Sequence, residues 1–111
     1  MKNRRLFYSA MLLGLTVGML ASAAARAEGD IKAGQVKSIP CMGCHAIPGY
    51  SNVYPTYHVP RVGGQHPQYI VAALKAYKSK QRSHPTMQAQ AATLSEDDMN
   101  DIAAFFSSKP E

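Results

Sequence analysis

The clearest periodic pattern in the chain is a helical repeat of apolar residues between Pro67 and about Lys80. The residues that recur at this spacing are Ile70, Ala73, Leu74 and Tyr77. Apolar positions three or four residues apart share one face of an α-helix, and a proline in the first helical turn loses no hydrogen bond. The segment is therefore predicted to be an amphipathic helix, and its C-terminal half is basic, with Lys75, Lys78, Lys80 and Arg82.

A second amphipathic helix is predicted to begin after Ser95. Serine is a favoured N-cap residue, and the three acidic residues that follow it suit the positive end of a helix dipole. The apolar positions that repeat at helical spacing are Met99, Ile102, Ala103 and Phe106. Lys109 and Pro110 end the pattern.

A shorter helix is expected from about Asp30 to Ile39, with Asp30 as its N-cap and Pro40 marking its end. Gly34 weakens this helix, so its presence predicts close packing against another element. No segment shows the alternation of a convincing strand, and residues 46–66 read as a long loop, rich in Pro, Gly and Tyr, that wraps a ligand. Three helices joined by long loops predict an all-α fold.

The N-terminus has the pattern of a secretory signal peptide. Basic residues precede an apolar run from Leu6 to about Leu20, and Ala25-Arg26-Ala27 has the small-x-small form of a cleavage site. We therefore expect residues 1–27 to be a signal peptide, residues 28–111 to form one domain, and the mature protein to be periplasmic. The alternative is a retained membrane tether, since the apolar run is close to the shortest length that spans a bilayer.

The leader also accounts for most of the basic character of the chain. Its removal would take four of the 12 Lys and Arg residues and none of the seven Asp and Glu residues, leaving the domain near neutrality. A near-neutral domain does not have the basic face that nucleic-acid binding requires. A domain of this size is marginally stable without a disulfide or a cofactor. A bridge between the two cysteines, three positions apart, would add little, so a cofactor is the better candidate.

The segment Cys41-Met42-Gly43-Cys44-His45 has the C-x-x-C-H form of c-type haem attachment. Two thiols on one turn can each form a thioether with a haem vinyl group, and the adjacent His45 then supplies the proximal ligand to the iron. A thioredoxin-like pair would need a βαβ context, and a zinc site would need further ligands at finger-like spacing. The motif predicts one covalently bound haem c.

The sixth iron ligand follows less directly from the residues. Three of the six methionines lie in the leader, Met42 lies inside the motif, and Met99 falls on an apolar helix face. Elimination favours Met87, in the predicted loop from Ser83 to Gln88. His84 is the main competitor, and the further histidine candidates are His58 and His66.

The sequence resembles the class I cytochromes c, and among them the bacterial cytochrome c4 and c553-like proteins. The matching segments are Ala33-Gly34-Gln35, the haem motif, Pro60 to Gln65 followed by Tyr69 and Leu74, and Arg82 to Met87 followed by Leu94-Ser95. The chain departs from the family at Ala46, where glycine is usual, and in its tyrosine-rich loop. It also has one haem domain where cytochrome c4 has two.

This resemblance implies a small class I cytochrome c fold, with thioethers at Cys41 and Cys44. It implies axial ligation by His45 and Met87, and it places Pro60, Gln65 and Tyr69 around the haem. It also implies that Gly34 lets the first helix cross the last near Phe105 or Phe106.

The implied function is single-electron transfer in the periplasm by a carrier that is not an enzyme. Its expected partners are redox proteins, with a membrane respiratory complex among the candidates, and neither nucleic acid nor a small-molecule substrate. The alternatives are a haem-bearing subunit of a larger or membrane-bound oxidoreductase, and an open-site haem enzyme or gas sensor. The four basic residues from Lys75 to Arg82 are a candidate docking rim, or simply a solvated helix face.

Overall fold

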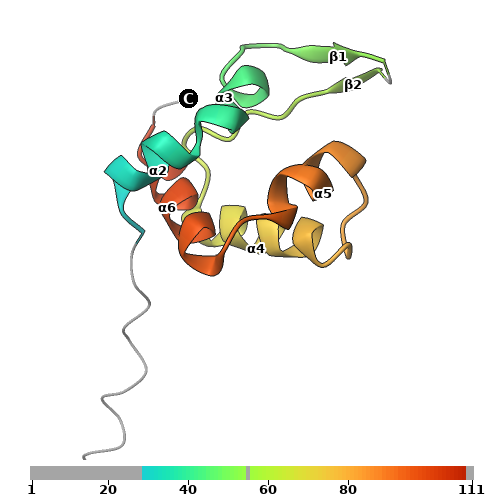
Figure 1. Ribbon diagram of the computed structural model, residues 1–111. Coiled ribbons are helices and arrows are strands. Elements are labelled where there is room, and N and C mark those ends of the chain that lie inside the picture. The colour runs from blue at the N-terminus through green and yellow to red at the C-terminus, as the bar shows by residue number, and fades with distance from the viewer. Residues whose placement is uncertain (1–28, 55, 110–111) are drawn as a thin grey trace, which may run out of the picture.

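The computed structural model describes residues 29–54 and 56–109, so the predicted signal peptide lies outside the described residues. The described part contains five helices and one antiparallel hairpin (Figure 1). They are α2 (Ile31–Lys37), α3 (Ile39–His45), β1 (Ser51–Val53), β2 (Thr56–His58), α4 (Pro67–Lys78), α5 (Pro85–Ala92) and α6 (Glu96–Ser107). The predicted all-α class is confirmed. None of these helices is long and apolar enough to cross a membrane.

Helices α2 and α6 cross in direct contact at Gly34 (Figure 1). A Cβ atom at Gly34 would lie 1.9 Å from the backbone oxygen of Asp101 and 2.9 Å from the Cβ of Phe105. No side chain fits in that space, so the prediction of close packing at Gly34 is confirmed. Asp30 caps α2 as predicted, because its carboxylate accepts hydrogen bonds from the backbone N–H groups of Lys32 and Ala33.

A charged cluster closes the same crossing. The Lys37 ammonium lies 2.7 Å from Asp98 Oδ1 and 2.6 Å from Asp101 Oδ2, and Asp101 Oδ1 accepts from the Asp30 backbone N–H at 2.7 Å. The hydrogen bonds to Asp101 and Asp98 raise the pKa of Lys37. Lys37, followed by Ser95, lowers the pKa of Asp98, while Lys37 and the Asp30 N–H lower that of Asp101. Charge and close packing therefore fix α2 on α6 together.

Helix α6 begins where the sequence predicts. The Ser95 hydroxyl accepts from the Asp98 N–H at 3.1 Å, and the Asp98 carboxylate accepts from the Ser95 N–H at 2.9 Å, which completes a capping box. The apolar residues of α6 form most of the core. The core residues are Ile70, Leu74, Ala91, Met99, Ile102, Ala103, Phe105 and Phe106. Met99 is 2% exposed, which confirms it as a core residue.

Three sequence expectations about local structure are wrong. Pro40 does not end a helical region, since α2 ends at Lys37 and Pro40 lies in the first turn of α3, where its missing N–H costs nothing. Residues 46–66 contain β1 and β2, paired with Ser51 opposite His58. These strands are too short to show a two-residue alternation in sequence. The predicted loop from Ser83 to Gln88 contains the start of α5.

Candidate haem site

The haem motif occupies α3, whose first turn accommodates Pro40. Ser38 ends α2 and its carbonyl accepts from the N–H groups of Cys41 and Met42, which starts the new helix at once. Residues three apart on a helix share a face, so Cys41 and Cys44 lie along one side of α3. The motif is thus presented by a regular helix whose direction is set by the α2–α6 crossing.

The two cysteines are free thiols in different environments. Cys41 is half-buried against the core cluster, whereas Cys44 is exposed. Burial, and then the neighbouring Cys44, raise the pKa of the Cys41 thiol. A thiol kept in its neutral form does not suit a redox-active cysteine pair, which needs a stabilised thiolate. The pair is better suited to covalent attachment of a cofactor.

His45 is oriented by the backbone of the loop that follows the hairpin. Its Nδ1 lies 2.7 Å from the carbonyl oxygen of Pro60. A carbonyl can only accept, so Nδ1 carries the proton and Nε2 keeps its lone pair. Metal-binding histidines are commonly fixed in this way by a backbone carbonyl. The contact holds one specific nitrogen ready for a metal, and it places Pro60 beside His45, as the resemblance implies.

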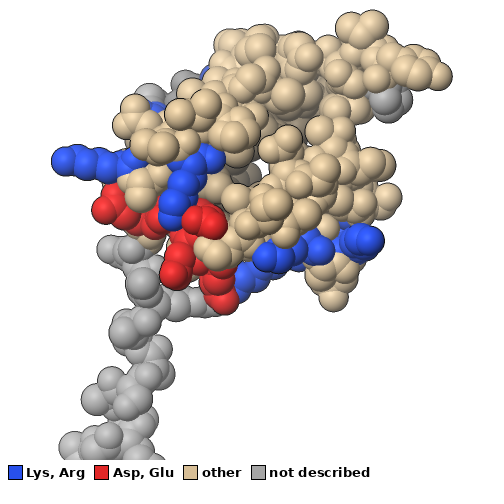
Figure 2. Space-filling model, in the orientation of Figure 1, with Lys and Arg blue, Asp and Glu red and all other residues tan. Residues whose placement is uncertain are grey.

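Met87 lies in the first turn of α5 and is half-buried against the core cluster. Figure 1 shows α3 and the hairpin on one side of the molecule and α4 and α5 on the other. Within residues 29–54 and 56–109, α3 and the hairpin make no helix or strand packing contact with α4 or α5. The space-filling view shows a recess between these two sides (Figure 2). The helices that carry His45 and Met87 therefore lie on opposite sides of it.

The side chains of Gln65 and Tyr69 are engaged elsewhere. The Gln65 carbonyl oxygen Oε1 accepts from the His66 backbone N–H, and the Tyr69 hydroxyl accepts from the Arg82 guanidinium at 3.5 Å. No hydrogen bond in the described part of the chain joins either residue to His45 or Met87. Their predicted place near the haem stays a prediction.

The competing histidines have other contacts. His58 lies on β2, where its Nδ1 is 3.0 Å from the Ser51 hydroxyl. His66 precedes the first turn of α4 and is exposed. His84 is the N-cap of α5, and its Nδ1 accepts from the Met87 backbone N–H. The described residues contain no group of three or more His, Cys, Asp or Glu that could hold a metal ion by themselves.

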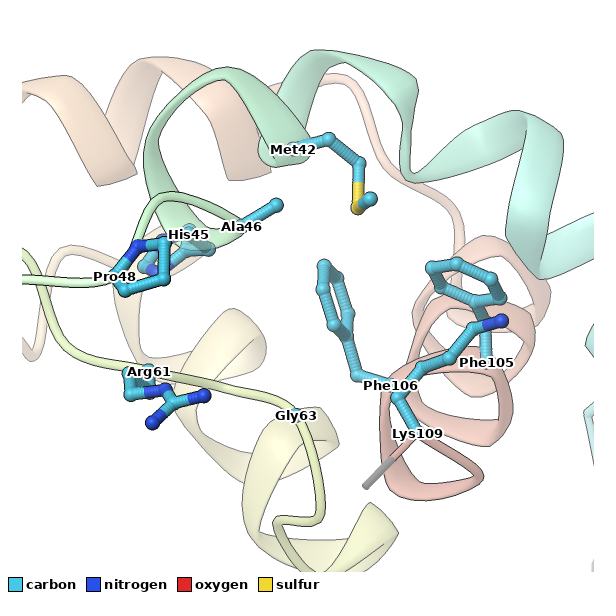
Figure 3. Close-up of a pocket in the computed structure, with 9 residues that line it drawn as sticks. All are labelled: Met42, His45, Ala46, Pro48, Arg61, Gly63, Phe105, Phe106 and Lys109. Carbon is cyan, nitrogen blue, oxygen red and sulfur yellow. The ribbon is translucent and has the colours of Figure 1, made fainter. Parts of the chain in front are cut away.

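A cavity of about 190 Å³ lies between α3 and α6 (Figure 3). Met42 projects into it from α3, and the ring of Phe106 projects from α6. Its walls are formed by Met42, His45, Ala46, Pro48, Arg61, Gly63, Phe105, Phe106 and Lys109. The aromatic residues of α6 thus face the haem motif across this cavity. The helical spacing predicts Phe106 on the apolar face of the last helix, but local spacing does not place that ring beneath α3.

The donor set fits a haem. It comprises two neighbouring free thiols, an imidazole whose Nδ1 is held by a backbone carbonyl so that Nε2 is the nitrogen left for a metal, and the half-buried thioether of Met87. Thioether and imidazole are the axial ligands of many cytochromes, and paired thiols next to such a histidine are the attachment groups of haem c. The sequence analysis names all four of these residues, and in the structure three of them lie on α3 and the fourth in the first turn of α5.

Comparison with known proteins identifies the same cofactor. No model of a protein family matches the chain. It is 35% identical over 107 residues to cytochrome c4 of Pseudomonas aeruginosa, covering 96% of this chain and 49% of that protein. It is 37% identical over 84 residues to cytochrome c-554(548) of Halomonas halodenitrificans, covering 73% of this chain and 98% of that protein. It is also 30% identical over 73 residues to the cytochrome subunit of sulfide dehydrogenase of Chlorobaculum tepidum, with 66% and 63% covered.

The chain belongs to the class I c-type cytochromes, and its cofactor is covalently bound haem c. The expected family and cofactor are therefore confirmed. The chain spans about half the length of the cytochrome c4 proteins it matches.

Proposed function

We propose that this protein is a periplasmic single-electron carrier whose haem is attached through Cys41 and Cys44. Its iron is bound by His45 Nε2 and the Met87 thioether. The observation that carries this proposal is the 2.7 Å contact between His45 Nδ1 and the Pro60 carbonyl, because it leaves Nε2 as the free donor. The location of α5 on the other side of the recess supports Met87 as the second ligand.

The haem supplies one-electron chemistry, and the residues of the chain limit the structural change that accompanies it. The Pro60 carbonyl fixes the rotation of the His45 ring, so this ligand has little freedom to rearrange between oxidation states. The two thiols attach the cofactor to one rigid helix. The described residues offer no arrangement of nucleophile, base and orienting group, and we therefore propose a carrier and not an enzyme.

We propose that the partner docks beside Cys44, the exposed end of the motif. The chain has no Lys, Arg, Asp or Glu between Lys37 and Arg61, and Figure 2 shows this side as almost free of charge. The exposed apolar residues there include Ile39, Met42 and Ile47. Redox encounters are small and short-lived, and an uncharged face predicts electron-transfer rates that change little with ionic strength.

The basic face of α4 is a weaker docking candidate than the sequence suggests. Lys75 pairs with Glu96, Lys78 donates to the Leu94 carbonyl, and Arg82 lies 4.8 Å above the centre of the Tyr77 ring. Three of the four cations are thus used within the molecule. A rate that falls steeply with added salt would instead favour this basic face.

Export through residues 1–27 and a mature domain of residues 28–111 belong to the same proposal. Mass spectrometry of the periplasmic fraction tests them, because a cleaved protein begins at Glu28. An intact N-terminus found with membranes would instead support a tethered form.

A second candidate is a haem subunit of a larger complex, favoured by the similarity to the cytochrome subunit of sulfide dehydrogenase. Isolation of the native protein with a tightly bound partner would support that candidate.

The axial ligand assignment is tested by Met87→Ala. We expect loss of the near-infrared methionine-to-iron band, a lower reduction potential by on the order of 0.2 V, and new binding of carbon monoxide to the reduced protein. Met99→Leu is the matched control, because Met99 is a buried core residue and the swap nearly conserves volume. A near-infrared band that survives Met87→Ala would show that the assignment is wrong. Carbon monoxide binding by the unmodified protein would favour an open-site enzyme or sensor.

A further inference from the structure

We propose that His84 is a positioning residue for Met87, and that Tyr57 of the hairpin holds His84 in place. Together these residues form a latch, defined as Tyr57, His84 and Tyr77, that joins the two sides of the recess. The proposal rests on the proposed function, because it concerns Met87 as an axial ligand of the iron. It assigns the hairpin a role in keeping that ligand bound.

The first contact of the latch is between His84 and the backbone of α5. His84 has an extended backbone, and its Nδ1 accepts from the Met87 N–H at 3.3 Å. Nδ1 is therefore the unprotonated nitrogen of His84 and Nε2 carries the proton. This is the reverse of His45, whose Nδ1 donates to Pro60. With this arrangement of protons, the nitrogen of His84 that has a free lone pair already accepts the Met87 N–H. Met87 is therefore the residue of this segment that remains to bind the iron.

The residue type at this cap is itself informative. Ser, Thr, Asp and Asn are the favoured N-caps, and each would satisfy the same N–H with a smaller side chain. A histidine adds an aromatic ring that a simple cap does not need. In this molecule the ring lies edge to face against Tyr57, with centroids 4.7 Å apart at 85°, and faces Tyr77 at 6.3 Å and 76°. Both contacts have the geometry that aromatic pairs favour.

The α4 side of the latch is fixed from behind. The Arg82 guanidinium lies over the Tyr77 ring, and the Arg82 backbone carbonyl accepts from the Gln88 side-chain amide at 2.9 Å. These two contacts hold Arg82, in the connection between α4 and α5, to both helices. Tyr77 and the first turn of α5 form a stable base against which His84 is held.

On the hairpin side, the latch has one ring contact among the described residues, and Tyr57 makes it. In the described part of the chain, the Tyr57–His84 pair is the one aromatic contact that joins the hairpin to the helical segments. The two strands of the hairpin pair with each other, with Ser51 opposite His58. Displacement of the hairpin would therefore free the His84 ring, loosen the cap and let the first turn of α5 open. The position of Met87 depends on a residue that is thirty positions earlier in the chain.

The test uses the full-length haem protein and measures how fast imidazole replaces the sixth ligand of the ferric iron. His84→Ala removes the cap and the ring, and we expect imidazole to bind about tenfold faster. Tyr57→Leu removes the ring contact alone, and we expect about a threefold increase. His84→Asn keeps a capping side chain, so its rate should fall between those of the unmodified protein and His84→Ala. Tyr57→Phe keeps the ring, and its imidazole-binding rate should equal that of the unmodified protein.

Tyr54→Leu is the matched control, since Tyr54 lies at the tip of the same hairpin and is 94% exposed. It should leave the rate unchanged. The Met87 amide hydrogen-exchange rate provides a second measurement, and it should rise in His84→Ala and Tyr57→Leu even if thermal unfolding shows no change. Rates in these two variants equal to that of Tyr54→Leu would overturn the latch while the Met87 assignment stands. A methionine-to-iron band that survives Met87→Ala would overturn both.

Discussion

The two sides of this molecule are stabilised in different ways. The α2–α6 crossing contains a glycine with no room for a side chain, a capping box and a lysine shared by two aspartates. The side formed by α3 and the hairpin has no Lys, Arg, Asp or Glu between Lys37 and Arg61, and in the described residues its hairpin meets the start of α5 through the ring contact of Tyr57 with His84. One side is completed by its own residues, whereas the other borders the recess, and we expect its stability to depend on the cofactor.

This difference shows how a small domain can bind a large cofactor. The close α2–α6 crossing fixes the direction of α3, and α3 carries both thiols and His45. The hairpin and α5 then approach from the two sides and meet at Tyr57 and His84. A domain of this size has little apolar surface to bury, so the haem supplies the interior that the chain does not.

The largest effect should follow from removal of both attachment thiols. We expect the double variant Cys41→Ala, Cys44→Ala to hold no covalent haem, so that its mass equals that of the polypeptide alone. Because the hairpin side depends on the cofactor, limited proteolysis should cut residues 46–66 first. Cleavage within α2 or α6 before cleavage within residues 46–66 would contradict the expected difference in stability between the two sides.

A side chain at the α2–α6 crossing should have the next largest effect. Gly34→Ala places a methyl group against the Asp101 backbone, which cannot move without shifting α6. We expect the free energy of unfolding to fall by about 3 kcal/mol in urea titration. Gly43→Ala is the matched control, because no atom beyond its chain neighbours and the backbone of its own helix lies within 4 Å of the added Cβ. It should be neutral or stabilise α3 by up to about 1 kcal/mol, and equal losses in both variants would refute the close-packing argument.

The smallest effect should be a change in the pH dependence of stability. Lys37 lowers the pKa of Asp98 and Asp101, so these carboxylates stabilise the folded state above their unfolded pKa of about 4, and this contribution is lost as the pH falls. The pKa of Lys37 is raised, so its contribution is present below about pH 10 and is lost at higher pH.

Urea titrations between pH 2 and pH 6 measure the acid side of this dependence. Lys37→Met should flatten the fall in the free energy of unfolding below about pH 4. Lys75→Met is the control, because the Lys75–Glu96 pair is more exposed to solvent and such pairs contribute little. If both variants flatten the curve equally, the Lys37 cluster has no special role.

The sequence by itself determined the parts of this protein that local patterns encode. It predicted the start of α6 at Ser95, the apolar faces of α4 and α6, the close packing of Gly34 and the haem motif, because each depends on residues within one or two helical turns. It also predicted Met87 by elimination. Its errors have two causes. Proline permits both a helix end and a helix start, and strands of three residues have no readable period.

Only the tertiary structure decided how these parts meet. It placed the Pro60 carbonyl on His45 Nδ1, set the ring of Phe106 beneath α3, and brought Tyr57 against His84. These pairs are separated by many residues, and no local spacing encodes them. They depend on the direction that the α2–α6 crossing gives to α3 and on the path of the chain through the hairpin.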